Sequence, residues 1–477
     1  MKKKLFASIV CFLLVLATLA SCNGGNKNPQ ETNPSSEAPE TKPEVLQELV
    51  PDKNMDRDFI ILTYVWEPLD REETGDAIKD IEVRRLKYLE NRFNITLSRS
   101  APNKGDVFAT LTGLENSDEH EFDLVDPHPT INMAGMLTTG VLKNLFDVNA
   151  LNLDRPWYNQ SQVKNHQING KLLLAVPDTT LNGQAFAAIV YNTALYQALG
   201  FSENLYQTVN EGKWTMEKLI SIVRECETSN LGDPENKIYG FGYWKNVSYC
   251  FMYALGQNVL QKNQDGAFEL ALVSDRLTTI VDKINELVFE TNATVVSETN
   301  NAGFKTSDMW VAFLDGRCLF QMYDIGSMSH LLRELSFEIK YLPLPKLYEA
   351  DEYRVTSASG FMAIPTIARD YEESGIIMES MAIYSHEYLR PAMYEKIMLG
   401  RLSKDPEDYQ MLTTLFDSKF YEFGTTFDSK GVAKDIIVNV VFGEGSTISG
   451  SNAIASYVKG HRNEFNEIVN TVNALGG

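Results

Sequence analysis

Short apolar, β-branched runs alternate with amphipathic helical segments along most of this 477-residue chain. The run from Phe59 to Trp66 stops at Glu67-Pro68 and predicts a buried strand. A helix is expected next, with an apolar stripe formed by Ile78, Ile81, Leu86, Leu89 and Phe93. Strands alternating with helices favour an α/β fold with mainly parallel sheets flanked by helices. The length is too great for a single core and indicates two such units.

The same alternation continues toward the carboxyl end. Further strands are expected at 122–125, 171–176, 185–191, 317–322, 338–342 and 360–364. Helices are expected after Thr215, which can serve as N-cap, from about Ser274 and from near Asp370. Asp265-Gly266 predicts a hairpin turn. Open sheets bind ligands beyond the carboxyl ends of their strands, so the residues that follow each strand are the first site candidates.

Residues 1–21 have the zones of a secretory signal in their usual order. Three lysines precede an apolar stretch from Leu5 to Ala20, which is closed by Ser21 and Cys22. The segment Leu19-Ala20-Ser21-Cys22 resembles the lipobox of bacterial lipoproteins, whose signal is cut before a cysteine that carries a diacylglyceryl group. The resemblance implies lipidation of Cys22. An uncleaved anchor helix is the alternative, although roughly 16 apolar residues is short for a membrane span.

Residues 22–55 are expected to be the lipidated cysteine and a disordered linker, because Asn23 to Val50 holds almost no large apolar side chain. The formal charge of −21 becomes −24 once a signal with three lysines and no acid is removed. Such a body repels nucleic acid and anionic lipid, so membrane contact is expected only through the anchor. Cys226, Cys250 and Cys318 are expected as buried small side chains, with a Cys226–Cys250 disulfide as the alternative.

Enzyme motifs are mostly missing from the sequence. It contains no His-Glu-x-x-His, phosphate loop or nucleophile elbow, and Gly240-Phe241-Gly242 lacks the third glycine of a dinucleotide fingerprint. We therefore expect no catalytic residue, no metal and no cofactor, and a packing role for Gly240 and Gly242. A carboxylate pair for glycoside hydrolysis stays open, since 64 acidic residues offer many pairings.

Several segments along the body resemble the extracellular solute-binding proteins of ABC importers, in the sugar-binding class related to maltodextrin-binding protein. The segments are Ile81–Ile95, Leu142–Leu145, Arg155–Gln160, Ile189–Thr193, Gly212–Thr215, Phe313–Phe320, Tyr341–Pro345 and Gly360–Pro365. Ile189–Thr193 is similar to a hinge strand that ends in Tyr-Asn, and Gly212–Thr215 to a helix start with Trp-Thr. The sequence departs from the class at Arg317-Cys318, where the class often has alanine and methionine, and at Ser327-Met328, where it has a tryptophan, so the cleft floor is expected to differ.

The resemblance implies a two-lobed fold of the periplasmic-binding-protein type II, joined by hinge strands. The first lobe would hold 56–180 plus 343–388, and the second 181–342 plus 389–477. The implied function is a monomeric, lipid-anchored extracytoplasmic receptor that captures a small solute, an oligosaccharide, and delivers it to an ABC permease. A surface polysaccharide-binding or glycan-cleaving lipoprotein and a peptide or polyamine receptor are the alternatives.

Sugar sites combine aromatic side chains, which cover the apolar sugar faces, with hydrogen-bonding groups for the hydroxyls. Residues of both kinds follow the expected strands. The candidate ligand-binding residues are Tyr64, Trp66, Asp126, Trp244, Tyr323, Asp324 and Ser359. Trp157 and Trp214 are expected to pack beside helix starts instead.

Overall fold

The structure is a computed structural model, and it describes part of the chain. The described residues are 44–64, 69–102, 106–115, 120–128, 132–183, 186–228, 236–297, 308–324, 335–357, 360–399, 405–443 and 450–475. The expected signal, Cys22 and most of the expected linker lie outside them. Within these ranges, no helix combines the length and the apolar character that a bilayer crossing requires.

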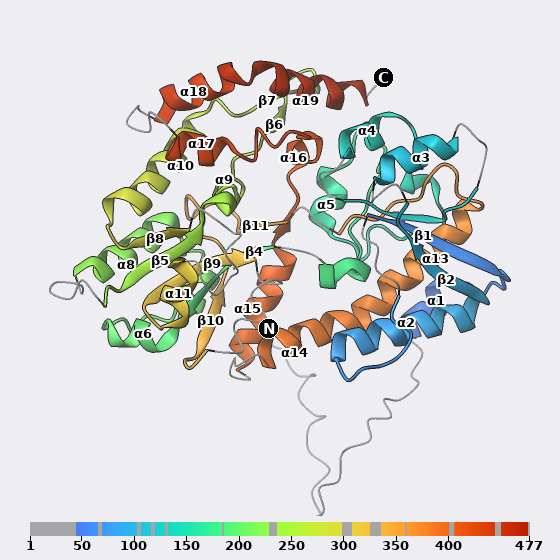
Figure 1. Ribbon diagram of the computed structural model, residues 1–477, viewed down its shortest axis with the longest axis horizontal. Helices are drawn as coiled ribbons and strands as arrows, with labels where there is room; N and C mark the ends of the chain where they lie inside the picture. The colour runs from blue at the N-terminus through green and yellow to red at the C-terminus, as the bar shows by residue number, and fades with distance from the viewer. Residues whose placement is uncertain are drawn as a thin grey trace, which may run out of the picture. The chain divides into compact units, whose positions relative to one another are not determined.

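The first sheet is fully parallel, with strand order β2-β1-β3. Its strands are β1 (Arg57–Thr63), β2 (Ile95–Ser100) and β3 (Leu124–Asp126). The apolar stripe of α2 (Ala77–Phe93) packs with α13 (Tyr371–Tyr384) and α1 (Glu44–Leu49) on one face, where Phe59 and Ile61 are buried (Figure 1). The other face meets α3 (Val107–Glu115) and α4 (Met133–Thr138). Both expected strands and the expected helix of this region are confirmed.

The second sheet has the order β10-β4-β9-β5-β8. Its strands are β4 (Ala187–Asn192), β5 (Tyr239–Trp244), β8 (Thr294–Ser297), β9 (Cys318–Asp324) and β10 (Ile339–Leu342). Strands β8, β5 and β9 are parallel, whereas β4 is antiparallel to both of its neighbours. Helices α8 (Met216–Thr228) and α10 (Asp275–Asn285) bury one face, and α11 (Asp308–Leu314) and α15 (Pro406–Asp417) the other. The α/β fold with helix-flanked sheets is confirmed.

Polar side chains cap the first turns of three helices. Ser274 and Asp370 accept hydrogen bonds from the first amides of α10 and α13, and Thr215 Oγ1 accepts from Lys218 N at 3.3 Å. The other α-helices are α5 (Gln160–Asn165), α6 (Thr193–Ala198), α7 (Leu205–Asn210), α9 (Tyr249–Ala254), α14 (Arg390–Leu399), α16 (Phe423–Phe427), α17 (Ile436–Phe442), α18 (Gly450–Gly460) and α19 (Arg462–Ala474). Short 3-10 turns are η2 (Leu145–Asp147), η3 (Asp178–Gly183) and η4 (Lys245–Val247), and π turns are η5 (Glu286–Glu290) and η8 (Ser385–Leu389).

Two expected strands, 171–176 and 360–364, are wrong as regular strands. They form isolated bridges, Ala175↔Met362 and Val125↔Ala363, that extend the first sheet beside β3. Pro365 forms a further isolated bridge, with Leu142, so the run from 360 passes from one partner to the next and makes a regular ladder with none of them. The expected hairpin is confirmed, since β6 (Leu260–Lys262) and β7 (Phe268–Leu270) are antiparallel and Gly266 turns with φ of +82°.

Three connections link the elements around the two sheets. One runs through η3 into β4, one follows β11 (Val355–Thr356) to the 360–364 bridges, and one is the continuous helix α13-η8-α14. Segment 343–357 still contacts second-sheet elements, because Trp214 Nε1 donates to the carbonyl of Pro343 and β11 pairs with β12 (Lys419–Phe420). The lobe boundaries stay a proposal.

The largest apolar core joins side chains from both sheets, from Leu62 to Phe241 and Phe320. Cys226, Cys250 and Cys318 are buried thiols, as expected, and the alternative disulfide is not formed. Gly240 and Gly242 serve close packing, since a Cβ on Gly240 would lie 2.8 Å from Val223. Trp157 and Trp214 are buried directly before α5 and α8, as expected.

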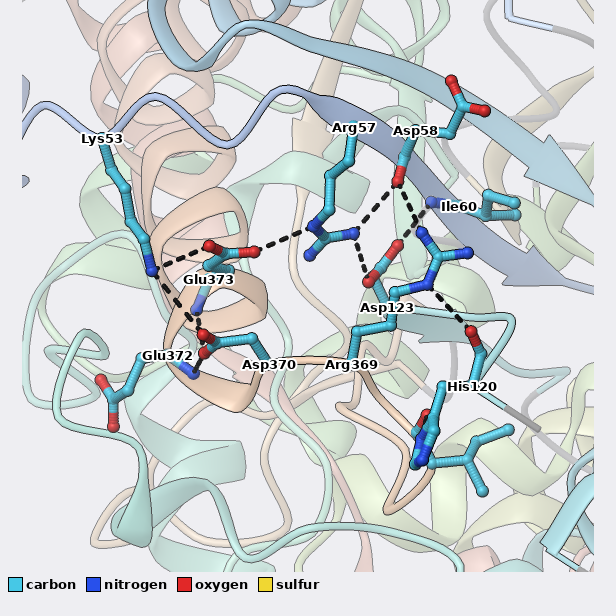
Figure 2. A network of polar contacts seen from close by, with 11 residues as sticks. Lys53, Arg57, Asp58, Ile60, His120, Asp123, Arg369, Asp370, Glu372 and Glu373 are labelled. Carbon is cyan, nitrogen blue, oxygen red and sulfur yellow. Dashed lines mark hydrogen bonds and ion pairs between the residues drawn. The ribbon is translucent and has the colours of Figure 1, made fainter. Parts of the chain in front are cut away.

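An ion network lies at the amino end of the first sheet (Figure 2). Arg57 donates to Asp123 at 2.7 Å and to Glu373 at 2.9 Å, and Lys53 lies 2.8 Å from the other oxygen of Glu373. Asp123 also accepts from the amide of Ile60 at 2.8 Å, and burial raises its pKa. The network ties β1 to α13 at the strand ends opposite to the expected site, so we assign it to stability.

Candidate functional site

Tyr64 and Asp126 lie together at the carboxyl ends of β1 and β3. Thr63 pairs with Asp126 across the sheet, and the amide of Tyr64 donates to the carbonyl of Asp126 at 3.3 Å. The half-buried Tyr64 ring meets His128 edge-on, with ring centroids 4.9 Å apart. This position follows from the register, because parallel strands bring their carboxyl ends to one edge of the sheet.

The Asp126 carboxylate is held in a poorly solvated place. Burial raises its pKa to about 6, and the positive charge of Arg99 at the end of β2 opposes that rise. Thr63 Oγ1 lies 3.4 Å from Asp126 Oδ2. A carboxyl group at this point can accept hydrogen bonds from ligand hydroxyls when ionised and donate one when protonated.

A second group lies at the carboxyl ends of β5 and β9. Trp244 closes β5, Tyr323 is the next-to-last residue of β9, and their ring centroids are 6.3 Å apart. Trp310 from α11 meets Tyr323 edge-on at 5.6 Å. Trp244 Nε1 is buried and has no hydrogen-bond partner within the described part of the chain. Buried indole N–H groups normally have a partner, so this donor suits a ligand oxygen.

The structure describes only one of the three remaining candidate residues, and that one by its backbone pairing. Asp324 ends β9 and pairs along the backbone with Ala187 of β4. Trp66 and Ser359 lie outside the described residues. Ser357, two positions before Ser359, pairs with Phe186, and its hydroxyl lies 3.3 Å from that of Tyr421. The structure therefore forms two groups, Tyr64 with Asp126 and Trp244 with Tyr323.

A charged cluster near the chain crossings was missed by the sequence analysis. Asp178 in η3 lies 2.7 Å from His386 in η8 and 3.4 Å from Arg390 in α14. Lys419 in β12 is 4% exposed, and burial lowers its pKa to about 7 although Asp178 opposes this. Asp178 is more than 200 positions from the other three residues, and no local pattern pairs it with them. The only sequence signal is a lysine between Phe416 and Phe420.

Two buried carboxylates outside these groups, Glu422 and Asp428, are occupied by backbone amides. Glu422 accepts from Val259 N at 3.0 Å and caps α16 through Thr425 N at 2.6 Å. Asp428 accepts from three successive amides that begin at Val432. Carboxylates bound in this way hold turns together and are poorly suited to proton transfer. Among the described residues, no group of His, Cys, Asp or Glu is arranged to hold a metal ion.

The comparisons with known proteins give a fold. No protein-family model matches the sequence, and no curated protein sequence matches it. A cyclo/maltodextrin-binding protein complexed with maltotetraose aligns with a TM-score of 0.58 at 13% identity, over 85% of this chain and 96% of that one. The GacH receptor of Streptomyces glaucescens, solved unliganded and with acarbose, aligns at 0.55 and 13%, over 87% and 99%. UgpB from Mycobacterium tuberculosis, in complex with glycerophosphocholine, aligns at 0.55 and 14%, over 86% and 98%.

These alignments span nearly the whole length of each solved protein and the body of this chain. Identities of 13–14% carry the fold and not the ligand. The chain therefore shares the two-lobed α/β fold of these solved proteins, with helix-flanked sheets.

Proposed function

We propose that the protein is a solute receptor of an ABC importer that captures an oligosaccharide between its two lobes. The observation that carries this proposal is the match of the fold, over nearly full length, to binding proteins such as GacH with acarbose and the cyclo/maltodextrin-binding protein with maltotetraose. The neighbours are binding proteins and not enzymes, so we propose capture and release without catalysis. Delivery to a permease and action as a monomer belong to the same proposal.

The side chains at the strand ends suit a sugar. Trp244 and Tyr323 offer aromatic surface, and Tyr64 offers a ring on the other sheet. Sugar rings present C–H faces to such surfaces and hydroxyls to polar groups such as Asp126 and the free Trp244 Nε1. We propose that Trp66, Asp324 and Ser359 complete this site.

The anchor and the mechanical cycle are also part of the proposal. Cleavage before Cys22 and lipidation of its thiol would hold the receptor at the extracytoplasmic face of a membrane. The tether would then be the residues before α1, because Leu46 and Val50 are buried in the core and the expected linker to 55 is too long. Ligand contacts from both lobes exist only when the lobes close, so binding favours closure. A permease can then distinguish loaded from empty receptor by lobe geometry.

The test is a calorimetric and thermal-shift screen of the soluble body against maltodextrins, other oligosaccharides, glycerophosphodiesters, peptides and polyamines. A ligand that binds only the folded state stabilises it by about 2.7 kcal/mol at 100 times its Kd. We expect saturable binding of an oligosaccharide with no new reducing ends after prolonged incubation. A shift with peptides or polyamines alone, or release of reducing ends, would replace the sugar-receptor proposal with one of the alternatives.

A further inference from the structure

A cavity of about 280 Å³ lies away from both groups of strand-end residues. One wall is formed by α4, the segment 140–144 and the hairpin around Lys171, and the other by Phe423 of α16 and the end of α19. Helices α16 and α19 both contact α4 (Figure 1). Protein interiors are close-packed, and this volume has room for roughly nine water molecules.

The walls of the cavity are mostly apolar. The apolar lining residues are Leu137, Leu142, Ile168, Leu173, Leu174, Phe423, Ala474 and Leu475. His166 closes the inner end, where it is 6% exposed and lies among aromatic rings that include Phe423 at 5.5 Å. Its Nε2 is 3.0 Å from Thr426 Oγ1, and burial lowers its pKa to about 4, so it is neutral at pH 7.

The polar groups at the cavity are mainly donors. Asn144 Oδ1 already accepts from the amides of Phe146 and Leu172, which leaves its Nδ2 as the polar atom available to a ligand. Lys171 contributes an exposed ammonium. Thr138 donates its hydroxyl to the carbonyl of Ala134. No Asp or Glu is among the lining residues, although the chain has 64 of them.

An apolar chamber with donors and one cation fits an apolar molecule that carries a single negative group. We propose that this cavity is a second binding site, for a small amphipathic carboxylate, with the apolar body against Leu142, Ile168 and Phe423 and the carboxylate on Lys171. The walls come from both proposed lobes, residues 137–174 from the first and Phe423, Ala474 and Leu475 from the second, but no lining residue belongs to the strand-end groups.

The test uses sodium hexanoate and sodium octanoate as probes, with 1-octanol as the uncharged comparison, by calorimetry on the soluble body. Each added CH₂ placed on apolar wall strengthens binding by roughly fourfold, so octanoate, with two more, should bind about fifteenfold more tightly than hexanoate. Octanol should bind more weakly than octanoate. Equal binding of the two acids, or no binding at millimolar concentration, overturns the proposal.

Two variants locate the site. Lys171→Met should weaken octanoate roughly three- to tenfold, while Lys164→Met, an exposed lysine outside the lining, should not. Ala474→Trp places an indole in the cavity from an exposed helix position and should abolish octanoate binding without loss of folding. Octanoate binding that survives Ala474→Trp, or that is lost with Trp244→Ala, would overturn this location. Failure of the sugar screen alone would leave the carboxylate site intact.

Discussion

At the scale of single residues, Trp244 is the side chain on which the proposed sugar site depends most. Truncation to alanine removes its aromatic surface and the buried Nε1 donor together. We expect Trp244→Ala to weaken oligosaccharide binding by about 1–2 kcal/mol, or roughly five- to thirtyfold. Calorimetry measures the change, and Tyr348→Ala, at a ring that is 50% exposed elsewhere, serves as the matched control. Equal losses in the two variants would contradict a ligand contact at Trp244.

Asp126 gives a prediction about pH. Burial raises its pKa to about 6, above the ordinary value near 3.9, so between pH 4 and 6 the folded protein holds a proton that the unfolded chain has lost. The contribution of this group to the free energy of unfolding therefore falls as pH rises through that window. We expect Asp126→Asn to unfold with a free energy higher by roughly 2 kcal/mol at pH 7, and with no difference near pH 4.

Urea denaturation at the two pH values measures this difference. Asp58→Asn, on an exposed position of β1, is the control and should leave the pH profile unchanged. If the difference in free energy of unfolding between Asp126→Asn and the wild type grew toward low pH, the carboxylate would be stabilised in its charged form, which would contradict the expectation for Asp126.

At the scale of secondary-structure elements, Asp178 connects the chain crossings. It contacts His386 and Arg390 and lies near Lys419, which packs over the rings of Phe186 and Phe416. Removing the carboxylate takes one partner from Arg390 and one favourable charge from the buried Lys419, so we expect Asp178→Ala to lower the free energy of unfolding by about 3 kcal/mol. Asp417→Ala removes a 60% exposed partner of the same Arg390 and should cost less than about 1 kcal/mol. Similar costs in urea unfolding would contradict this ranking.

Most of the helices and turns could be predicted from sequence patterns within a few neighbouring residues. The stripes of α2 and α10, the N-caps at Thr215 and Ser274 and the turn at Gly266 depend on neighbours within a few positions, and all are confirmed. The errors at 171–176 and 360–364 have a common cause. The apolar runs at these positions predict strands. Whether such a run forms a regular ladder depends on a partner segment far away in the sequence, and here each run forms only isolated bridges.

The site could be predicted only in part, for the same reason. Placing Tyr64 with Asp126 and Trp244 with Tyr323 needed only the rule that parallel strands end at one edge. The cluster around Asp178 and the contact of His166 with Thr426 join positions 200 or more residues apart, and a single sequence does not carry that pairing.

At the scale of the whole molecule, the proposed function requires the lobes to move when ligand binds. The three connections through η3–β4, the segment after β11 and α13-η8-α14 permit a bend without breaking either sheet. We expect the energy-transfer efficiency between dyes on Lys87→Cys in α2 and Ser221→Cys in α8 to change with oligosaccharide, along the same curve as binding. Both positions are exposed, and the native Cys226, Cys250 and Cys318 are buried, so labelling should be selective.

Trp244→Ala should shift that curve to higher ligand concentration without changing its end points, because the bent state is unchanged and only its affinity for ligand falls. Saturable binding with constant transfer efficiency would mean that ligand is captured without lobe closure, and the signal read by a permease would then have to be local to the ligand site.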